Sequence, residues 1–505
     1  MKTWLVLLLT ALAFTVVLVG TVMAILHSPH GAKAKSRDAP HPTAAPQPPV
    51  EPVERTRSAV PALGLYVAET ARDTVFLPES TGKSLPAPHD ASDGFGHHVR
   101  MSADGTTLLE IYRRGGDVTF KKKNDDETNY EANNSLIFYR RKDDAWQPYT
   151  ANMASKKFTS YFPNVALGAN VSTDGQFGNS SAHCFDVSGE ATYAAVQWRL
   201  PDSNTGAVAL YKYNGDGNYS IDQDRRSNHV LRMGPAGVPG DNFGKVVRFL
   251  GDKRLMVSAD LNSRTAIGGA VRIYRAGTDP EGPIFVQSDV DTDIVAPLGE
   301  EKRSFGDACA GDANATTVWV SSCNSEFSRV YAYQRESEDK EFGPPTLTFD
   351  LGLPNVRVND IALSDPADYC AVAHDGHVFI FARREAGGTA YVSEPVQTLF
   401  APPLIDYKES LGFGASVRMS KDARVLAVGC APSSPRGNYR SYVFVYRLDP
   451  ETGRYAEAST ANGDPQYLAG TAGSAVDFNL TATGDAATLL RGVPEAGELH
   501  TYHLA

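Results

Sequence analysis

The sequence predicts an all-β fold built from repeated units, and three observations support this prediction. A short strand that ends in an aromatic residue occurs seven times, and a hairpin with a polar turn precedes each of these strands. The last unit stops three residues after its aromatic residue, whereas a separate β-rich segment stands before the first unit. Repeated units of this size that close into a ring are typical of a β-propeller. We therefore expect a seven-bladed β-propeller.

The aromatic strands define the period of the repeat. Their final aromatic residues are separated by 48 to 72 residues, which is the size of one blade of four short strands. The clearest copy is Val443-Phe-Val-Tyr446. The seven strands end at Tyr139, Tyr211, Tyr274, Tyr333, Phe381, Tyr446 and Tyr502.

The hairpins that precede these strands are clearest at residues 95–108 and 413–428. Each has two alternating apolar runs joined by a Ser-x-Asp turn, and Asp and Gly readily adopt the backbone angles of such turns. A Phe-Gly pair opens four of the seven copies, at Phe95, Phe243, Phe305 and Phe413. Weaker copies follow Phe185, Ile361 and Phe478.

Closure of the ring requires one more strand. The seventh unit lacks an outer strand because the sequence ends shortly after Tyr502. Residues 73–78 (DTVFLP) stand just before the first hairpin and are the natural donor. Pairing of this segment with the last unit would cover a sheet edge that otherwise favours aggregation.

The Phe-Gly pair, the following Val, the turn, a Leu-x-Val strand and a later Val-x-Val-Tyr strand together resemble the FG-GAP repeat of integrin α-chain propellers. The segment 426–432 (LAVGCAP) is the best single match, and the resemblance covers roughly residues 62–505. It implies a propeller that binds extracellular partners. The calcium loop of that family is missing, because the corresponding turns hold too few oxygen ligands for Ca²⁺. Asp289, Asp291 and Asp293 have suitable spacing but lie outside that turn.

The N-terminal part differs in character. Residues 4–26 contain no charged side chain, and a helix of this length spans a hydrocarbon core of about 30 Å. Residues 1–26 are therefore either a retained signal-anchor or a signal peptide cut after Ala24. Residues 27–61 are rich in Pro and Ala and predict an extended stalk. The propeller then occupies residues 62–505.

The charges beside the apolar segment and the glycosylation sequons favour opposite orientations of the chain in the membrane. Lys33, Lys35 and Arg37 follow the apolar segment, which by the positive-inside tendency favours a cytoplasmic body. Six Asn-x-Ser/Thr sequons favour an extracellular or lumenal glycoprotein, which is the localisation we expect, with secretion as the alternative. The sequons are Asn133, Asn170, Asn179, Asn218, Asn314 and Asn479.

The five cysteines indicate few disulfides. Cys309 and Cys323 fall in one predicted hairpin and are the best candidates for a bridge. The alternative is that all five cysteines are small buried apolar residues.

Composition and motifs exclude several functions. The formal net charge of −11 argues against a nucleic-acid partner. No nucleophile elbow, phosphate-binding loop or zinc-protease motif is present. The histidine pairs His97-His98 and His374/His377 straddle a strand or a turn, so neither predicts a metal site. We expect no catalytic residue, cofactor or metal.

Polar connections predict a binding face. The link between the second and third strands of the first unit is long, and two other polar links open on the same face, which in propellers usually binds partners. Each link is equally compatible with an ordinary surface loop. The candidate ligand-binding residues are Lys121, Lys122, Lys123, Asn262, Arg264, Arg436, Asn438 and Tyr439.

We therefore expect a membrane-tethered extracellular recognition or adhesion protein for a protein or glycan ligand. The Ser-x-Asp turns also resemble the Asp-boxes of sialidase propellers, so an extracellular hydrolase or lyase is an alternative. A structural subunit of a surface or envelope assembly is a further alternative.

Overall fold

The chain divides into two compact units in this computed structural model, residues 1–59 and 60–505. The described residues all belong to the second unit. They are 76–78, 85–86, 93–113, 118–121, 127–130, 134–142, 145–148, 184–199, 206–213, 219–220, 230–233, 242–259, 268–279, 282–287, 292–297, 304–374, 376–386, 388–402, 412–431, 440–457, 467–472, 478–483, 486–493 and 498–504. The predicted anchor and stalk lie outside these residues.

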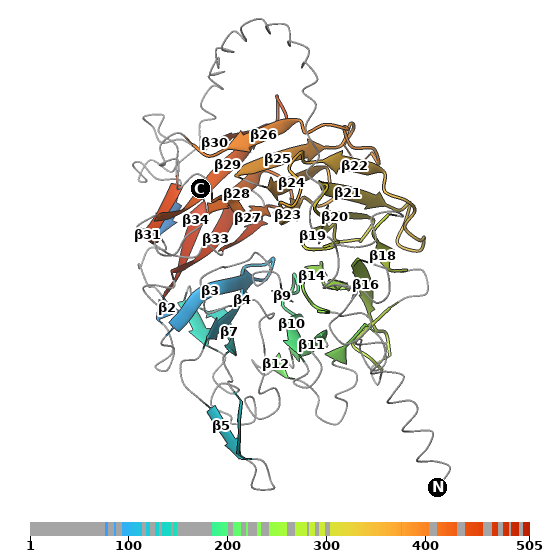
Figure 1. The fold of residues 1–505 in the computed structure, drawn as a ribbon. Helices are drawn as coiled ribbons and strands as arrows, with labels where there is room; N and C mark the ends of the chain where they lie inside the picture. The colour runs from blue at the N-terminus through green and yellow to red at the C-terminus, as the bar shows by residue number, and fades with distance from the viewer. Residues whose placement is uncertain are drawn as a thin grey trace, which may run out of the picture. The chain divides into compact units, whose positions relative to one another are not determined.

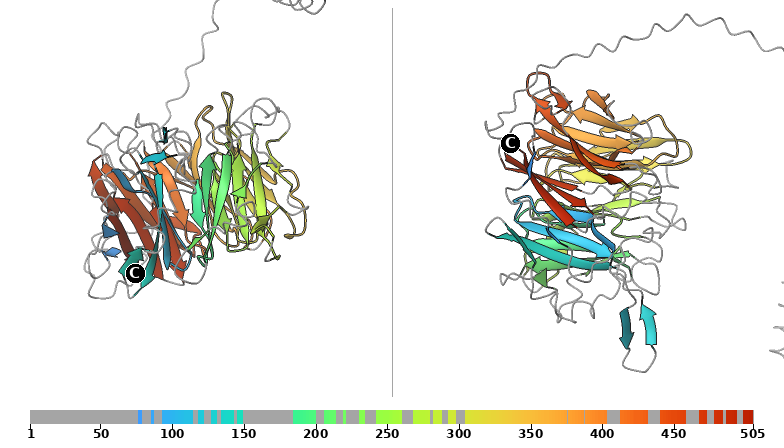
Figure 2. Two further views of the ribbon diagram at one scale, coloured as in Figure 1. Left: turned by 90° about the horizontal axis from the view of Figure 1, so that it is seen from below. Right: turned by 90° about the vertical axis from the view of Figure 1, so that its left-hand side faces the viewer.

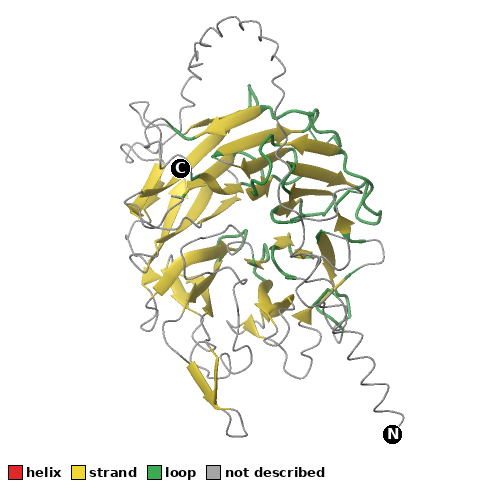
Figure 3. Ribbon diagram, viewed as in Figure 1, coloured by secondary structure: helices red, strands yellow, loops and turns green. Residues whose placement is uncertain are grey.

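Strands form the secondary structure throughout the described part of the second unit (Figure 3). Among these residues, no helix is long and apolar enough to cross a membrane. Within the described residues, the strands form seven antiparallel sheets of four or five strands and one separate two-stranded ribbon. The sheets stand side by side around a common centre, which makes this unit a β-propeller (Figure 1).

The first four sheets follow the chain order. The first is β3 (Asp93–Met101), β4 (Thr107–Arg113), β7 (Asn134–Lys142) and β8 (Ala145–Pro148). The second is β9 (Phe185–Val187), β10 (Tyr193–Arg199), β11 (Gly206–Tyr213) and β12 (Tyr219–Ser220), with β13 (Val230–Leu231) also on β11. The third is β14 (Val247–Leu250), β15 (Arg254–Ala259), β16 (Ala270–Ala276) and β17 (Phe285–Val286), with β18 (Ile294–Val295) also on β16. The fourth is β19 (Cys309–Gly311), β20 (Thr317–Cys323), β21 (Ser328–Gln334) and β22 (Leu347–Asp350).

The last three sheets complete the ring. The fifth is β23 (Val358–Leu363), β24 (Tyr369–His374), β25 (His377–Ala382) and β26 (Gln397–Phe400). The sixth is β27 (Phe413–Met419), β28 (Val425–Cys430), β29 (Arg440–Asp449) and β30 (Arg454–Glu457), with β31 (Tyr467–Ala472) also on β29. The seventh is β32 (Phe478–Thr483), β33 (Ala486–Val493), β34 (Glu498–Leu504) and β1 (Phe76–Pro78), with β2 (Leu85–Pro86) also on β34.

The predicted closure of the ring is confirmed. β1 pairs antiparallel with β34, and Phe76 lies opposite Leu504. The N-terminal strand therefore supplies the outer strand that the last sheet lacks. The seventh sheet also contacts the first, because β3 packs against β32 and β33.

The predicted aromatic strands are confirmed as the third strand of each sheet. Each final aromatic residue lies opposite a residue near the start of the second strand, which shows that the repeats share one register. The pairs are Tyr139–Leu108, Tyr211–Ala194, Tyr274–Leu255, Tyr333–Val318, Phe381–Cys370, Tyr446–Leu426 and Tyr502–Leu489.

The turns between first and second strands also repeat. In five sheets the first turn residue is Ser or Asp, and its side chain accepts a hydrogen bond of 2.8–3.0 Å from the backbone N–H five residues later. The residue three positions after it has a positive φ of 51–70°. These φ values belong to Gly105, Ala191, Ala315, Ala367 and Ala423.

Three phenylalanines of the Phe-Gly pairs, Phe243, Phe305 and Phe413, lie in buried clusters that join neighbouring sheets. Phe243 belongs to one buried cluster with Val208 and Leu210 of the second sheet and Val257 of the third. The glycine after it has φ +92°, a conformation that favours Gly over other residues. The Phe-Gly repeat is thus explained by packing between blades.

The long connection predicted after β4 forms a ribbon. β5 (Val118–Lys121) and β6 (Glu127–Tyr130) pair antiparallel, with Lys121 opposite Glu127. The ribbon projects from the first sheet, away from the ring of sheets (Figure 2). The polar segment that the sequence presents as a loop is therefore in part a β-hairpin.

The predicted Cys309–Cys323 disulfide is wrong. Both residues do lie in one hairpin, but each is a buried thiol. Cys309 lies opposite Val320, three residues before Cys323 on β20. Three residues of strand span about 10 Å, which exceeds the Cα separation that a disulfide allows. The alternative interpretation of the cysteines as small buried apolar residues describes all five.

Candidate functional site

A cavity of about 230 Å³ lies where the innermost strands of the seven sheets converge. Each of these strands contributes at least one residue to its wall: β3, β9, β14, β19, β23, β27 and β32. Sites in the central opening of a ring of blades draw on residues that are far apart in sequence, because each blade contributes one short strand. This cavity is the candidate functional site.

The repeat places basic residues in the wall at equivalent positions. Arg100 and Arg418 each precede by two residues the serine that opens the turn between the first and second strands. Arg248 stands two residues before Leu250, where β14 meets β15. In the fourth and fifth sheets the equivalent positions are Ala310 and Ala362, whose small side chains leave space.

Asp360 holds two of these arginines. Its side chain is 2% exposed, forms an ion pair with Arg418 Nη1, and lies 3.7 Å from Arg248 Nη2. Its two oxygens also accept backbone hydrogen bonds from Ile361 N (2.9 Å) and Val417 N (3.1 Å). The carboxylate therefore fixes guanidinium groups from two different sheets.

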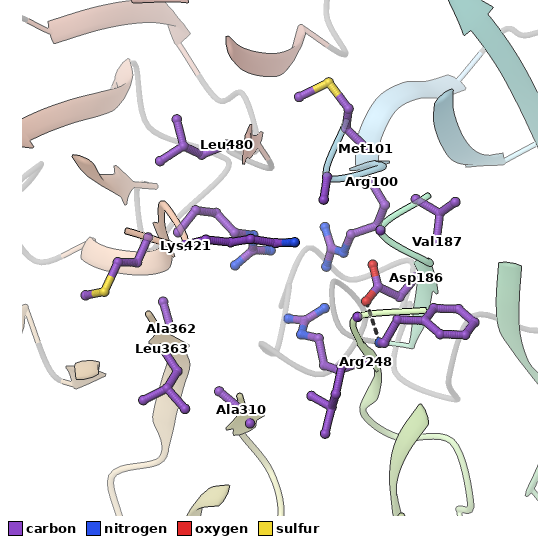
Figure 4. Close-up of a pocket in the computed structure, with 18 of the residues that line it drawn as sticks. Arg100, Met101, Asp186, Val187, Arg248, Ala310, Ala362, Leu363, Lys421 and Leu480 are labelled. Atoms are coloured by element: carbon purple, nitrogen blue, oxygen red, sulfur yellow. Dashed lines mark hydrogen bonds between the residues drawn. The ribbon is translucent and has the colours of Figure 1, made fainter. Parts of the chain in front are cut away.

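Asp186 stands on β9 at the position that the arginines occupy in other sheets, two residues before Ser188. Its Oδ2 accepts a hydrogen bond of 2.8 Å from Phe249 N of the third sheet. In Figure 4 the Asp186 carboxylate lies between the guanidinium groups of Arg100 and Arg248, and all three side chains point toward the centre of the cavity. Arg100 is 1% exposed and stacks over the ring of Phe185, with its Cζ 5.0 Å from the ring centroid.

Burial and charge shift the ionisation of this cluster. Burial raises the pKa of Asp186, and the positive charges of Arg248 and Arg100 oppose that rise. Burial also lowers the pKa of Arg248 to about 10, and repulsion from Arg100 and Arg418 lowers it further, against the attraction of Asp360 and Asp186. Arg248 nevertheless stays charged at neutral pH. Positive charge is thus concentrated in a poorly solvated space.

The cavity opens toward the turns between first and second strands. Ala103, Gly189, Gly251 and Lys421 line this end, and Lys421 is exposed. At the start of the innermost strands, Asp307 forms an ion pair with buried Lys245 and lies 3.3 Å from Arg357 Nε. The two ends of the central opening are therefore chemically different.

The structure places few of the predicted ligand-binding residues. Lys121 ends β5 in the projecting ribbon. The other candidates lie outside the described residues: Lys122, Lys123, Asn262, Arg264, Arg436, Asn438 and Tyr439. Connections between second and third strands leave the sheet at the end opposite to the first turns, so the cavity mouth and the predicted face are on different sides of the ring.

Sequence reasoning missed the cavity. A signal was present, because a Val-Arg pair recurs at the same position of three repeats, at Val99-Arg100, Val247-Arg248 and Val417-Arg418. Arginine side chains are rarely buried without a charged partner or access to solvent, so an arginine that recurs on a predicted buried strand indicates one of the two. Asp360 carries no such repeated signal.

The sequons and metal candidates are placed in part. Asn314 lies exposed in the turn between β19 and β20, and Asn479 lies in β32. The sequons Asn133, Asn170, Asn179 and Asn218 lie outside the described residues.

The aspartates that the sequence spaces like metal ligands are placed in part. Asp293 forms a bidentate ion pair with Arg272, at 2.7 Å for both contacts. Within the described ranges, no three His, Cys, Asp or Glu side chains are grouped as metal ligands.

Comparisons with known proteins found distant matches among solved structures. No family model matches the chain, and no curated protein matches it either. Among solved structures it is similar to Kuenenia stuttgartiensis hydrazine synthase, at 12% identity over 82% of this chain and 97% of that one, with a TM-score of 0.45. The β-propeller domain of Cps50 (Swd1) from Myceliophteria thermophila matches at 11% identity over 83% and 98%, with a TM-score of 0.43. A chain of the Mitotic Checkpoint Complex matches at 10% identity over 94% and 99%, with a TM-score of 0.44.

These similarities are distant, and no activity is transferred from them. The FG-GAP resemblance has no matching family model and stays a prediction.

Proposed function

We propose that this protein is a membrane-tethered recognition protein whose β-propeller presents a binding face to an extracellular protein or glycan. In this proposal each of the seven sheets is one blade of an FG-GAP-like propeller without calcium loops. Residues 4–26 anchor the chain, and residues 27–61 hold the propeller away from the membrane. The role is binding rather than catalysis.

The observation that supports this function is the β5–β6 ribbon. In the fourth and fifth sheets the second and third strands join tightly: Asn324 Oδ1 accepts hydrogen bonds from Glu326 N (2.6 Å) and Phe327 N (2.8 Å) between β20 and β21. His374 and His377 lie directly opposite each other where β24 meets β25. In the first sheet this link extends into a separate ribbon, which is either a functional element or a tolerated insertion.

The ribbon has the properties of a recognition element on a rigid base. It grows from β4 and β7, which pair along seven consecutive residues from Thr107–Arg140 to Arg113–Asn134. Its tip segment, residues 121–127, carries three lysines followed by acidic residues. A projecting hairpin also has unpaired strand edges that can accept a strand of a partner.

Proximity labelling on cells that display the full chain tests this function. We expect a variant in which an Asn-Gly turn replaces residues 117–131 to lose the partners that the native chain labels. The control is Gly343→Ala, whose added Cβ would have no atom within 4 Å. An unchanged set of partners after removal of the ribbon would contradict the proposal.

Orientation is tested separately at Asn314, the exposed sequon. On an extracellular propeller, we expect Asn314→Gln to remove one step of glycosidase-sensitive mobility on a gel. A chain without any such sensitivity, together with labelling by cytoplasmic reagents only, would place the propeller on the cytoplasmic side.

A further inference from the structure

We propose that the central cavity binds a small oxyanion, a molecule bearing a carboxylate or phosphate group, through Arg100, Arg248 and Arg418. This site goes beyond the proposed recognition function. It uses different residues from the ribbon, and its mouth lies on the opposite side of the ring.

The charge of the cavity wall is the first argument. Three arginines and Asp186 line the cavity, and Asp360 pairs with two of the arginines, which leaves an excess of one positive charge even when both carboxyl groups are ionised. Lys421 adds a further positive charge at the mouth. Burial lowers the pKa of Arg248, and repulsion from Arg100 and Arg418 adds to this effect. A bound anion would relieve this repulsion, because charges interact strongly where little water screens them.

The arrangement of the guanidinium groups is the second argument. They come from three different sheets yet converge on one space, and the guanidinium group matches the two oxygens of a carboxylate or phosphate. Asp360 already accepts two backbone hydrogen bonds and fixes Arg418, so the side chains are held in place before any ligand arrives. Such preorganisation reduces the entropy lost on binding.

The size and polarity of the cavity limit the ligand. A volume of about 230 Å³ admits a small molecule and not a polymer segment. Apart from the charged residues, the wall is formed largely by apolar or small residues such as Val187, Leu250, Ala310, Leu363 and Met419. These suit the carbon body of a small organic acid or organic phosphate.

A purely structural role is the competing explanation, in which the arginines and aspartates only tie the innermost strands together. The two explanations differ in one measurable respect. A structural network binds no added anion, whereas a binding site saturates with one.

Isothermal titration of the full chain with succinate and with inorganic phosphate, at constant ionic strength, tests the site. We expect saturable binding of one or both probes, weakened at least about tenfold by Arg248→Met, because loss of a charged hydrogen-bond donor to an anion costs on that order. The matched control is Arg329→Met, since Arg329 is a partly exposed arginine that pairs with Asp350 on β21 and β22. This control should change the affinity less than about twofold.

Lys421→Met provides a second test that does not disturb the buried network. We expect it to weaken binding by about threefold at low salt and by less at high salt, because a charge at the mouth acts through solvent. Preference for succinate or for phosphate identifies which oxyanion the site takes. The proposal is overturned if neither probe gives saturable heat up to about 10 mM, or if binding is unaffected by both Arg248→Met and Lys421→Met. Should Arg248→Met fail to fold, unchanged affinity in Lys421→Met is sufficient to overturn it. Removal of the ribbon should leave binding of the probes intact.

Discussion

Gly206 should tolerate no side chain, although its backbone is an ordinary strand. It begins β11, the third strand of the second sheet, and lies against Phe243 at the entry to the third sheet. A Cβ added here would lie 2.7 Å from Phe243 Cα and closer still to the backbone nitrogen and oxygen of that residue. The nearest of these atoms, Phe243 N, would be 2.1 Å away. Atoms in good contact are about 3.5 Å apart, so Phe243 would have to move by roughly 1.4 Å.

That movement would affect several interactions at once. Phe243 is fully buried, and its carbonyl accepts a hydrogen bond of 3.2 Å from Gln197 Nε2. The next residue, Gly244, donates its N–H to Ser258 O at 2.9 Å. Overpacking costs about 1–3 kcal/mol, and a strained hydrogen bond adds about 1 kcal/mol. Replacing Gly by Ala also stabilises the fold by about 0.4–1 kcal/mol, because it lowers the conformational entropy of the unfolded chain. We expect Gly206→Ala to lower the free energy of unfolding by about 2–3 kcal/mol.

Urea denaturation followed by tryptophan fluorescence measures this loss. With a slope of about 3 kcal/mol/M, the midpoint should fall by roughly 0.7–1 M. Gly189→Ala is the matched control, because its Cβ would lie 3.5 Å from Ala103 Cβ in the first turn of the neighbouring sheet, which is an ordinary contact. A Gly206→Ala midpoint equal to that of Gly189→Ala would refute the argument that Phe243 is fixed against Gly206.

Three further predictions concern buried polar groups. Tyr455→Phe should lower the free energy of unfolding by about 1–2 kcal/mol, because its hydroxyl donates to Ala423 O at 2.6 Å; urea midpoints compared with those of Tyr467→Phe, a more exposed tyrosine, check this. Thiol titration in denaturant should find five reactive thiols per chain, and a value of three would contradict this by showing one disulfide. The native chain should react slowly near pH 8, because burial raises the pKa of Cys309 to about 12 and the thiolate is the reactive form. Burial raises the pKa of Tyr211 above its usual value of 10.0, so the unfolded chain releases this proton at lower pH than the folded chain does. The free energy of unfolding should therefore fall as the pH rises above about 10. A urea midpoint that does not fall between about pH 9 and 11, or that falls equally in Tyr211→Phe, would contradict this.

Local patterns in the sequence predicted the repeated unit. The turn hydrogen bond from Thr107 N to Ser102 Oγ spans five residues, and strand alternation has a period of two. Both are visible in a single stretch of chain. The closing strand β1 was also predictable, because a repeat that ends early requires a donor elsewhere.

The cysteine pair shows where this reasoning stops. Cys309 and Cys323 belong to one hairpin in sequence and in structure, yet the register sets Val320 opposite Cys309. A shift of a few residues in register decides whether two side chains meet, and turn length does not fix it when the turn is irregular.

The sequence by itself therefore determined the all-β class, the repeated unit and the way the ring closes, because each depends on neighbours along the chain or on counting strands. Only the tertiary structure decided the candidate site. Arg100, Arg248 and Arg418 stand on strands separated by most of the chain, and only the closed ring of sheets brings their charges together around Asp186 and Asp360. Their shared space, and the electrostatic repulsion within it, exist only once all the innermost strands are in place.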